Sequence, residues 1–199
     1  MKKIISVLLC VMLLAGCCVS CASANGYEKC VDQLCNAMEK GNFKTISGLV
    51  DWKHVDALKE IEDEDYDAKE AREEAEDSFK ESIEDLEYEF EKRYSVEHGN
   101  IKELDNEFNG KSLEQMKKLI DKKNDGENPD ITAFVNEFVA GLDYVQPVKT
   151  NLTVKSRDGE EKDRDEITLN CYCFKGKWYI DINGMVSRSF RVLMARDDR

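Results

Sequence analysis

The chain has little histidine and little proline, with two residues of each among 199. Such scarcity excludes a histidine-rich metal site and predicts few long loops. A basic patch is also lacking: 29 lysines and arginines stand against 42 acids, for a formal net charge of -13. Because phosphate groups are bound by clustered positive charge, nucleic acid and anionic membrane surfaces are excluded as direct partners.

Apolar material is not scarce. Hydrophobic residues make up 41% of the chain, enough for one packed core once the N-terminus is set aside. We therefore expect a single α+β domain over residues 26–199.

The N-terminus has the pattern of a secretory signal. Lys2 and Lys3 precede an apolar run over residues 4–14, which is too short to span a bilayer as a stable helix. The run leads into Leu-Ala-Gly-Cys at residues 14–17, which resembles the bacterial lipobox, in which the cysteine receives a diacylglyceryl group and becomes the mature N-terminus. We expect residues 1–16 to be removed as a lipoprotein signal peptide. The lipid on Cys17 would then anchor the protein to the bacterial cell membrane, facing outside the cytoplasm, with residues 17–25 as a tether.

An alternative reading of the N-terminus stays open. Ala-Ser-Ala at residues 22–24 also fits the small-residue rule for ordinary signal cleavage. Cleavage there would leave an unmodified chain that begins at Asn25.

An antiparallel hairpin near the C-terminus is the centre of the predicted fold. Apolar residues alternate over residues 167–173 and again over residues 178–182, on either side of the turn at residues 175–177. Residues 148–154 alternate in the same way, so three strands are expected to form a meander. One apolar face of such a sheet needs cover, which the preceding helices must supply. The predicted architecture is N-terminal helices packed on a C-terminal antiparallel sheet of three to four strands.

Helical spacing predicts the covering helices. Apolar residues recur at i, i+3, i+4 and i+7 over residues 27–38, and Gly41 ends that helix. A second, shorter helix is expected from Phe43 to near Trp52.

Capping signals predict two further helices. Ser112 and Gln115 form a capping box for a helix that ends near residues 125–126. Asn128 and Pro129 open another helix, which ends at Gly141. Residues 101–108 suit a strand or a helix, and residues 185–199 suit a short helix or a further strand.

Residues 56–93 are the most acidic part of the chain, with 18 acids against six lysines and arginines. Apolar residues still mark one face of this segment at helical spacing: Phe79, Ile83, Leu86, Phe90 and Tyr94. We predict one long acidic helix at about residues 56–95, packed in its C-terminal half and solvated in its N-terminal half.

An aspartate repeat in this segment is superficially similar to a calcium loop. Asp63, Asp65 and Asp67 alternate, and Glu74 stands at the twelfth position. Ala68 occupies the sixth position, where the loop needs glycine. A solvated helix is the favoured interpretation, and no metal site is predicted.

Two short stretches carry a resemblance to a known class of domain. The first helix ends in Glu-Lys-Gly-Asn-Phe at residues 39–43, and the hairpin holds Phe-Lys-Gly-Lys-Trp-Tyr-Ile-Asp at residues 174–181. With the order of helices and strands over about residues 26–184, this resembles the cystatin-like, nuclear-transport-factor-type domains of bacterial surface lipoproteins. That resemblance implies a sheet curled around the first helix, with a conical pocket between them. The long acidic helix departs from the compact helices of that family.

The side chains on the predicted inward faces would line such a pocket. They are Tyr27, Val31, Leu34, Met38, Leu169, Cys171, Cys173, Trp178 and Ile180. None of them is a carboxylate or a histidine, and alternation places Tyr179 and Asp181 on the opposite face. His98, the histidine that could act as a base, is expected in a loop. Catalysis in a pocket needs an ionisable group with a shifted pKa, and the predicted faces offer none.

The expected function is therefore a non-enzymatic binding or interaction module without a cofactor. Its partner would be an envelope protein or a small apolar ligand. Members of the resembled family also include small isomerases and dehydratases, so an isomerase or lyase that uses the pocket is the first alternative. A spacer protein whose acidic helix projects from the membrane is the second.

Four cysteines belong to the domain rather than to the N-terminus: Cys30, Cys35, Cys171 and Cys173. Neither the pair on the helix nor the pair on the strand is spaced for a bridge within its own element. Buried thiols are favoured over a disulfide that joins helix to sheet, and both readings stay open. A zinc site is disfavoured because neither pair has the spacing of a zinc knuckle.

Overall fold

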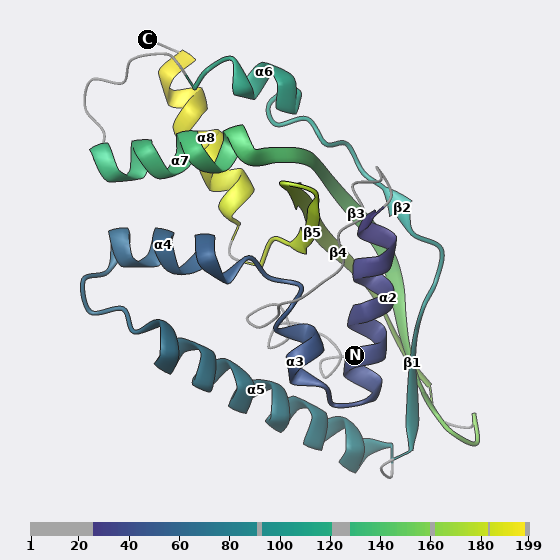
Figure 1. Cartoon of the computed structure of the whole chain (residues 1–199). Coiled ribbons are helices and arrows are strands. Elements are labelled where there is room, and N and C mark those ends of the chain that lie inside the picture. The colour runs from purple at the N-terminus through teal and green to yellow at the C-terminus, as the bar shows by residue number, and fades with distance from the viewer. Residues whose placement is uncertain (1–25, 91–92, 121–127, 160–161, 183, 198–199) are drawn as a thin grey trace.

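The structure, a computed structural model, describes residues 26–90, 93–120, 128–159, 162–182 and 184–197 (Figure 1). The predicted signal peptide, the lipidation site and the tether lie outside the described residues. In chain order the elements are α2 (Gly26–Glu39), α3 (Phe43–Ile46), α4 (Trp52–Glu62), α5 (Ala68–Glu89), β1 (Tyr94–His98), β2 (Lys102–Glu103), α6 (Leu113–Lys117), α7 (Pro129–Gly141), β3 (Leu142–Ser156), β4 (Lys162–Phe174), β5 (Lys177–Ile180) and α8 (Met185–Asp197). The fold is α+β, a curled antiparallel sheet with helices on both faces.

The predicted meander corresponds to β3, β4 and β5, which form the middle and one edge of the sheet. Strands follow the order β1-β3-β4-β5, and β2 pairs with β3 beyond the end of β1. A two-residue turn joins β4 to β5, in which Lys175 has a φ of 48° and Gly176 a φ of 81°. Turns with two positive φ angles match the twist of the strands that they connect. Sequence alternation missed β1, and of residues 101–108, which suited a strand or a helix, Lys102 and Glu103 form the short strand β2. The sheet therefore has five strands rather than three to four.

Both faces of the sheet are covered at its centre. The residues that alternate along β4, Ile167, Leu169, Cys171 and Cys173, are all buried on the face that packs against α2. On the other face, Tyr172 and Phe174 are also buried, with ring centroids 5.5 Å and 5.8 Å from that of Phe138 in α7. Residues 171–174 therefore form a continuous buried run, as in strands that are covered on two sides.

The first two predicted helices have different outcomes. The helix over residues 27–38 is confirmed as α2, and Gly41 follows it with a φ of 57°. The prediction of a second helix as far as Trp52 is wrong, because α3 ends at Ile46 and Trp52 is the first residue of α4. Asp51 interrupts the apolar spacing as the N-cap residue of α4.

The prediction of one long helix at about residues 56–95 is also wrong. The chain leaves the helical conformation at Asp63, which has φ −137° and ψ 109°, and starts α5 after Asp67. The side chain of Asp67 accepts hydrogen bonds from the backbone N–H groups of Lys69 (2.8 Å) and Glu70 (3.0 Å). Aspartate favours such caps over helix interiors, which explains the break.

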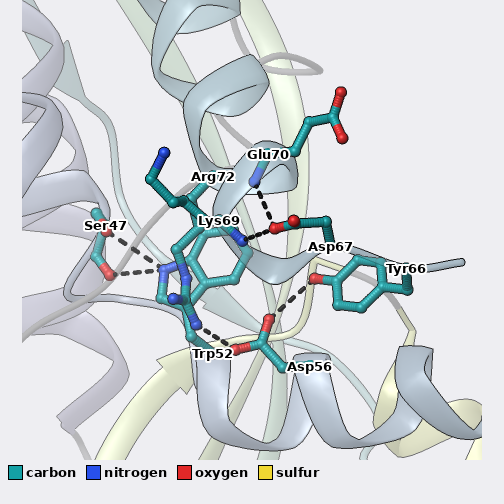
Figure 2. A network of polar contacts seen from close by, with 8 residues as sticks. All are labelled: Ser47, Trp52, Asp56, Tyr66, Asp67, Lys69, Glu70 and Arg72. Atoms are coloured by element: carbon teal, nitrogen blue, oxygen red, sulfur yellow. Dashed lines mark hydrogen bonds and ion pairs between the residues drawn. The ribbon is translucent and has the colours of Figure 1, made fainter.

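A network of polar contacts holds α4 and α5 together across this break (Figure 2). The hydroxyl of Tyr66 donates to Asp56 Oδ1 at 2.9 Å, and Arg72 forms an ion pair with Asp56 Oδ2. The guanidinium of Arg72 also lies over the ring of Trp52, 5.2 Å from the centroid. The indole N–H of Trp52 donates to Ser47 O at 3.2 Å. The N-terminal half of the acidic segment is thus divided between two helices rather than forming one. Its side chains are exposed or half-buried from Lys59 to Glu74, so the prediction that this half is largely solvated is confirmed.

The apolar face of α5 agrees with the predicted stripe as far as Phe90. Phe79, Ile83, Leu86 and Phe90 are buried. Tyr94, expected to extend the stripe, instead begins β1, and its hydroxyl donates to Met38 O at 3.0 Å.

The capping signals were accurate. The capping box of Ser112 and Gln115 is present at α6, and Asn128 caps α7, which ends at Gly141. The prediction that this helix continues to near residues 125–126 is wrong, because α6 ends at Lys117, with Lys118 as its C-cap residue. Residues 185–197 form a helix, α8, where the sequence allowed a helix or a strand. Within the described part of the chain, no helix is both long and apolar enough to cross a membrane.

Candidate functional site

The residues predicted to line a conical pocket lie in the hydrophobic core. All nine are buried, with exposed fractions of 5% or less, and they belong to the same cluster of packed side chains. Tyr27 of α2 meets Trp178 of β5 edge to face, with ring centroids 5.7 Å apart. Side chains of α2 and of the sheet therefore pack directly on each other.

Cys171, one of these nine, also borders a small cavity of about 70 Å³ between the sheet, α8 and the loop at residues 105–108. A water molecule occupies about 30 Å³ in the liquid, so this space suits about two waters. Asp181 borders the same cavity. Because β5 ends at Ile180, alternation along the strand did not predict the position of this carboxylate.

Asp181 is bound to the first turn of α8. Its two carboxylate oxygens accept hydrogen bonds from the backbone N–H groups of Met185 (2.7 Å) and Val186 (3.1 Å). Burial raises the pKa of Asp181 to about 6, although these backbone hydrogen bonds act to lower it. With both oxygens engaged, the carboxylate serves as a helix cap.

A second buried polar pair, Asp51 and His54, was missed by the sequence reasoning. Asp51 Oδ2 lies 2.6 Å from His54 Nδ1, and both side chains are 6% exposed. The imidazole packs against Phe138 and Phe174, at centroid distances of 5.3 Å and 4.4 Å. An aspartate at the N-cap with a histidine three residues later was the available signal, because this spacing brings the two side chains together on the first turn. The pair is buried between α7, which supplies Phe138, and β4, which supplies Phe174.

A groove between α2 and β1 forms an open polar site. It has a volume of about 450 Å³ and is lined by Asp32, Cys35, Asn36, Glu39, Lys40, Val96, Glu97 and His98. Three carboxylates and one lysine stand around it. The groove is therefore acidic.

His98 joins the two sides of the groove. Its Nε2 lies 2.8 Å from Asp32 Oδ1, and its Nδ1 lies 2.8 Å from Gly99 O. Burial opposes the charged form of the imidazole, but the bonds to Asp32 and Gly99 outweigh burial and raise the pKa of His98. In the protonated form, both nitrogens donate to these oxygens. His98 was expected in a loop, whereas the structure places it as the last residue of β1.

The backbone of β1 borders the same groove. Gly99 N–H donates to Asn151 O, and Arg157 N–H donates to Arg93 O. In this antiparallel register, residues 93, 95, 97 and 99 bond to β3, so Tyr94, Val96 and His98 direct their N–H and C=O groups away from the sheet. Val96 N–H meets Glu39 Oε2 at 3.4 Å, a long contact.

A second hollow lies between α4 and α5, next to the contacts drawn in Figure 2. It has a volume of about 270 Å³, and its lining mixes apolar and charged side chains: Trp52, Val55, Lys59, Tyr66, Ala71, Glu74, Ala75 and Ser78. Beside the hollow, Asp56 and Arg72 form an ion pair with each other.

The four cysteines of the domain are buried free thiols in the structure. Burial raises the pKa of Cys30 and Cys35 to about 12, and that of Cys173 to about 11. Across the residues that the structure describes, no three histidine, cysteine, aspartate or glutamate side chains are grouped so as to hold a metal ion.

Comparisons with known proteins add no assignment. No family, no curated protein and no solved structure matches this chain.

Proposed function

We propose that the protein is a lipoprotein, held outside the cytoplasm by a lipid on Cys17, and that its domain is a non-enzymatic binding module. The observation that carries this proposal is Leu-Ala-Gly-Cys at residues 14–17, directly after a charged and then apolar N-terminus. The position of the domain supports it, because α2 begins at Gly26, a few residues beyond Cys17.

The buried ionisable groups favour binding over catalysis. A general base needs a lone pair within reach of its substrate. The carboxylate of Asp181 is held by the first turn of α8, where each oxygen accepts one backbone N–H, and the Asp51–His54 pair is buried against aromatic rings. The rival function, a small isomerase or lyase, is favoured by one observation, that Asp181 has a raised pKa and borders a cavity. A cavity of about 70 Å³ is far smaller than the usual 300–1,000 Å³ of ligand pockets, so binding is the better proposal.

We also assign the domain to the cystatin-like type as part of this proposal. A first helix packed on a curled antiparallel sheet and a hairpin closed by Lys175 and Gly176 support the assignment. The packed core departs from it, because α2 and the sheet meet without a wide cone between them.

Mass spectrometry of the mature protein tests the proposal. We expect the chain to begin at Cys17 and to carry a diacylglyceryl group, and the protein to fractionate with membranes. A Cys17→Ala variant should be released into the medium or accumulate with its signal attached, whereas Cys18→Ala should be processed normally. An unmodified mature chain that begins at Asn25 would refute lipid anchoring.

A further inference from the structure

The two edges of the sheet differ in how they are covered. At one edge, β5 donates from Ile180 N–H to Leu49 O at 2.8 Å, so the segment before α4 occupies that side. At the other edge stands β1, whose strand neighbour in the described part of the chain is β3. An edge strand with outward N–H and C=O groups is a template for another strand.

The sequence of β1 has only part of the usual protection of an edge. Natural edges are blunted by short strands, charged side chains, proline, bulges or a covering element. β1 is short, with five residues, and carries one carboxylate, Glu97, but it contains no lysine or proline. β1 pairs residue for residue with β3 over its whole length, without a bulge. The side chain of Glu39 reaches one outward N–H group, that of Val96, at 3.4 Å.

The charge of the groove indicates which strand the edge would accept. Asp32 and Glu39 project from α2 beside β1, and Glu97 carries a third carboxylate on the strand itself. Asp32 is bonded to His98 and Glu97 is ion-paired with Lys155. Glu39, which meets Val96 N–H at 3.4 Å, is therefore the carboxylate that a cationic side chain can reach without displacing one of these pairs. Lys40 is the lysine among the lining residues, and the whole chain has a net charge of −13. Long-range repulsion disfavours an acidic segment here and attraction favours a basic one.

We propose that β1 binds an extended, lysine- or arginine-bearing segment of a partner protein as an additional strand of the sheet. This proposal rests on the proposed binding function and names its partner class and its site. The N–H and C=O groups of Tyr94, Val96 and His98 supply the main-chain bonds, as in other complexes in which a peptide extends a sheet. Glu39 exchanges its long contact with Val96 N–H for a cationic side chain of the added strand, while a carbonyl of that strand takes over the N–H.

Peptide binding to the full-length protein, purified in detergent, tests the proposal. The first probe is a peptide of about ten residues in which lysine and valine alternate, a strand-forming pattern. The second has the same sequence with every backbone amide methylated, so that it keeps its charge but cannot donate main-chain hydrogen bonds. The third replaces lysine with glutamate.

We expect the lysine peptide to bind with a dissociation constant below about 1 mM at low salt. The methylated peptide should bind at least about tenfold more weakly, since several main-chain bonds are lost. The glutamate peptide should bind more weakly still. Equal binding of the first two peptides, or no binding of the lysine peptide, would overturn the proposal, because charge alone or nothing at all would then explain the result.

A pair of variants locates the binding edge. His98→Pro removes an outward N–H group, and His98→Ala keeps that group while it removes the same side chain, so their difference reports the main chain. We expect the proline variant to bind about three- to tenfold more weakly than the alanine variant, and Glu39→Gln to bind about two- to fivefold more weakly than the parent. Equal affinity of the two His98 variants would overturn the assignment to β1.

Circular dichroism shows whether His98→Pro has folded. If it has not, the proposal is decided by whether the parent protein binds the lysine peptide more tightly than the methylated peptide. Lipidation of Cys17 is measured separately by mass, so loss of the β1 proposal would leave the anchoring proposal standing. Loss of the anchoring proposal would likewise leave the β1 proposal standing.

Discussion

Truncation of Trp178 tests the packing of α2 on the sheet. The indole is 4% exposed, and its centroid lies 5.7 Å from that of Tyr27 and 6.0 Å from that of Tyr144. Gly26 lies so close that a Cβ atom there would be 2.0 Å from Trp178 Cδ1. Backbone and aromatic rings thus surround the indole, and the site has little freedom to collapse after truncation.

We expect Trp178→Ala to lower the free energy of unfolding by about 3–5 kcal/mol, the range for a large buried aromatic. The two ring contacts account for about 0.5–1.5 kcal/mol each within that total. Domains of this size have about 5–15 kcal/mol in all, so the variant would be close to unfolding at ambient temperature. With a urea dependence of about 2 kcal/mol per molar, the midpoint should fall by about 2 M.

Urea titration followed by far-ultraviolet circular dichroism measures this change. Tyr144→Ala is the matched control, because the side chain of Tyr144 is 42% exposed and stacks on the same indole. It should lose no more than about 1.5 kcal/mol. A Trp178→Ala midpoint equal to that of the parent would refute the packing of the indole beneath α2, and would mean that β5 is shifted in register by one residue.

Three further changes test other elements of the fold. The pKa of Asp181 is raised from 3.8 to about 6, so its contribution to stability is fully present below about pH 3.8 and is lost as pH rises through about 6. Relative to Asp181→Asn, the parent should therefore gain up to about 3 kcal/mol in urea titrations between about pH 7 and pH 4, and parallel pH profiles would contradict this. Asn128→Ala should cost about 1 kcal/mol through loss of the α7 cap, while Asn128→Asp should cost little; equal losses would show that the cap is not responsible. Gly141→Ala should cost about 1–3 kcal/mol in thermal or urea unfolding, because its Cβ would lie 2.2 Å from Phe174 Cε2, whereas Gly99→Ala meets nothing closer than 3.7 Å; equal effects would contradict the close packing at Gly141.

Local signals in the sequence predicted three boundaries correctly, although the caps at Asp51 and Asp67 were missed. The capping box at Ser112, the cap at Asn128 and the turn at Lys175 were found because each depends on residues within one turn of it. Alternation along residues 167–173 also predicted the buried face of β4 correctly.

Signals that depend on distant partners were missed. The break at Asp63 is stabilised by Tyr66 and Arg72, which both reach back to Asp56, and helical spacing on either side does not reveal it. The strand at residues 94–98 has only five residues and follows a helical stripe whose spacing Tyr94 continues.

The candidate groove could not be predicted, because its parts come from separate segments. Asp32 and His98 are 66 residues apart in the chain. Their contact depends on how α2 lies against the edge of the sheet, which the sequence pattern does not specify.

The buried thiols have a consequence for how the protein can be handled and observed. Cys30, Cys35, Cys171 and Cys173 are each no more than 5% exposed, and folding of the described domain closes no disulfide among them. Only the thiolate reacts readily with alkylating reagents, and burial suppresses both its formation and its encounter with reagent. Alkylation of Cys30, Cys171 and Cys173 at neutral pH must then wait for an opening of the core, so the rate of mass increase of the peptides that contain them reports such openings without any introduced label. The native cysteines therefore report how often α2 separates transiently from the sheet.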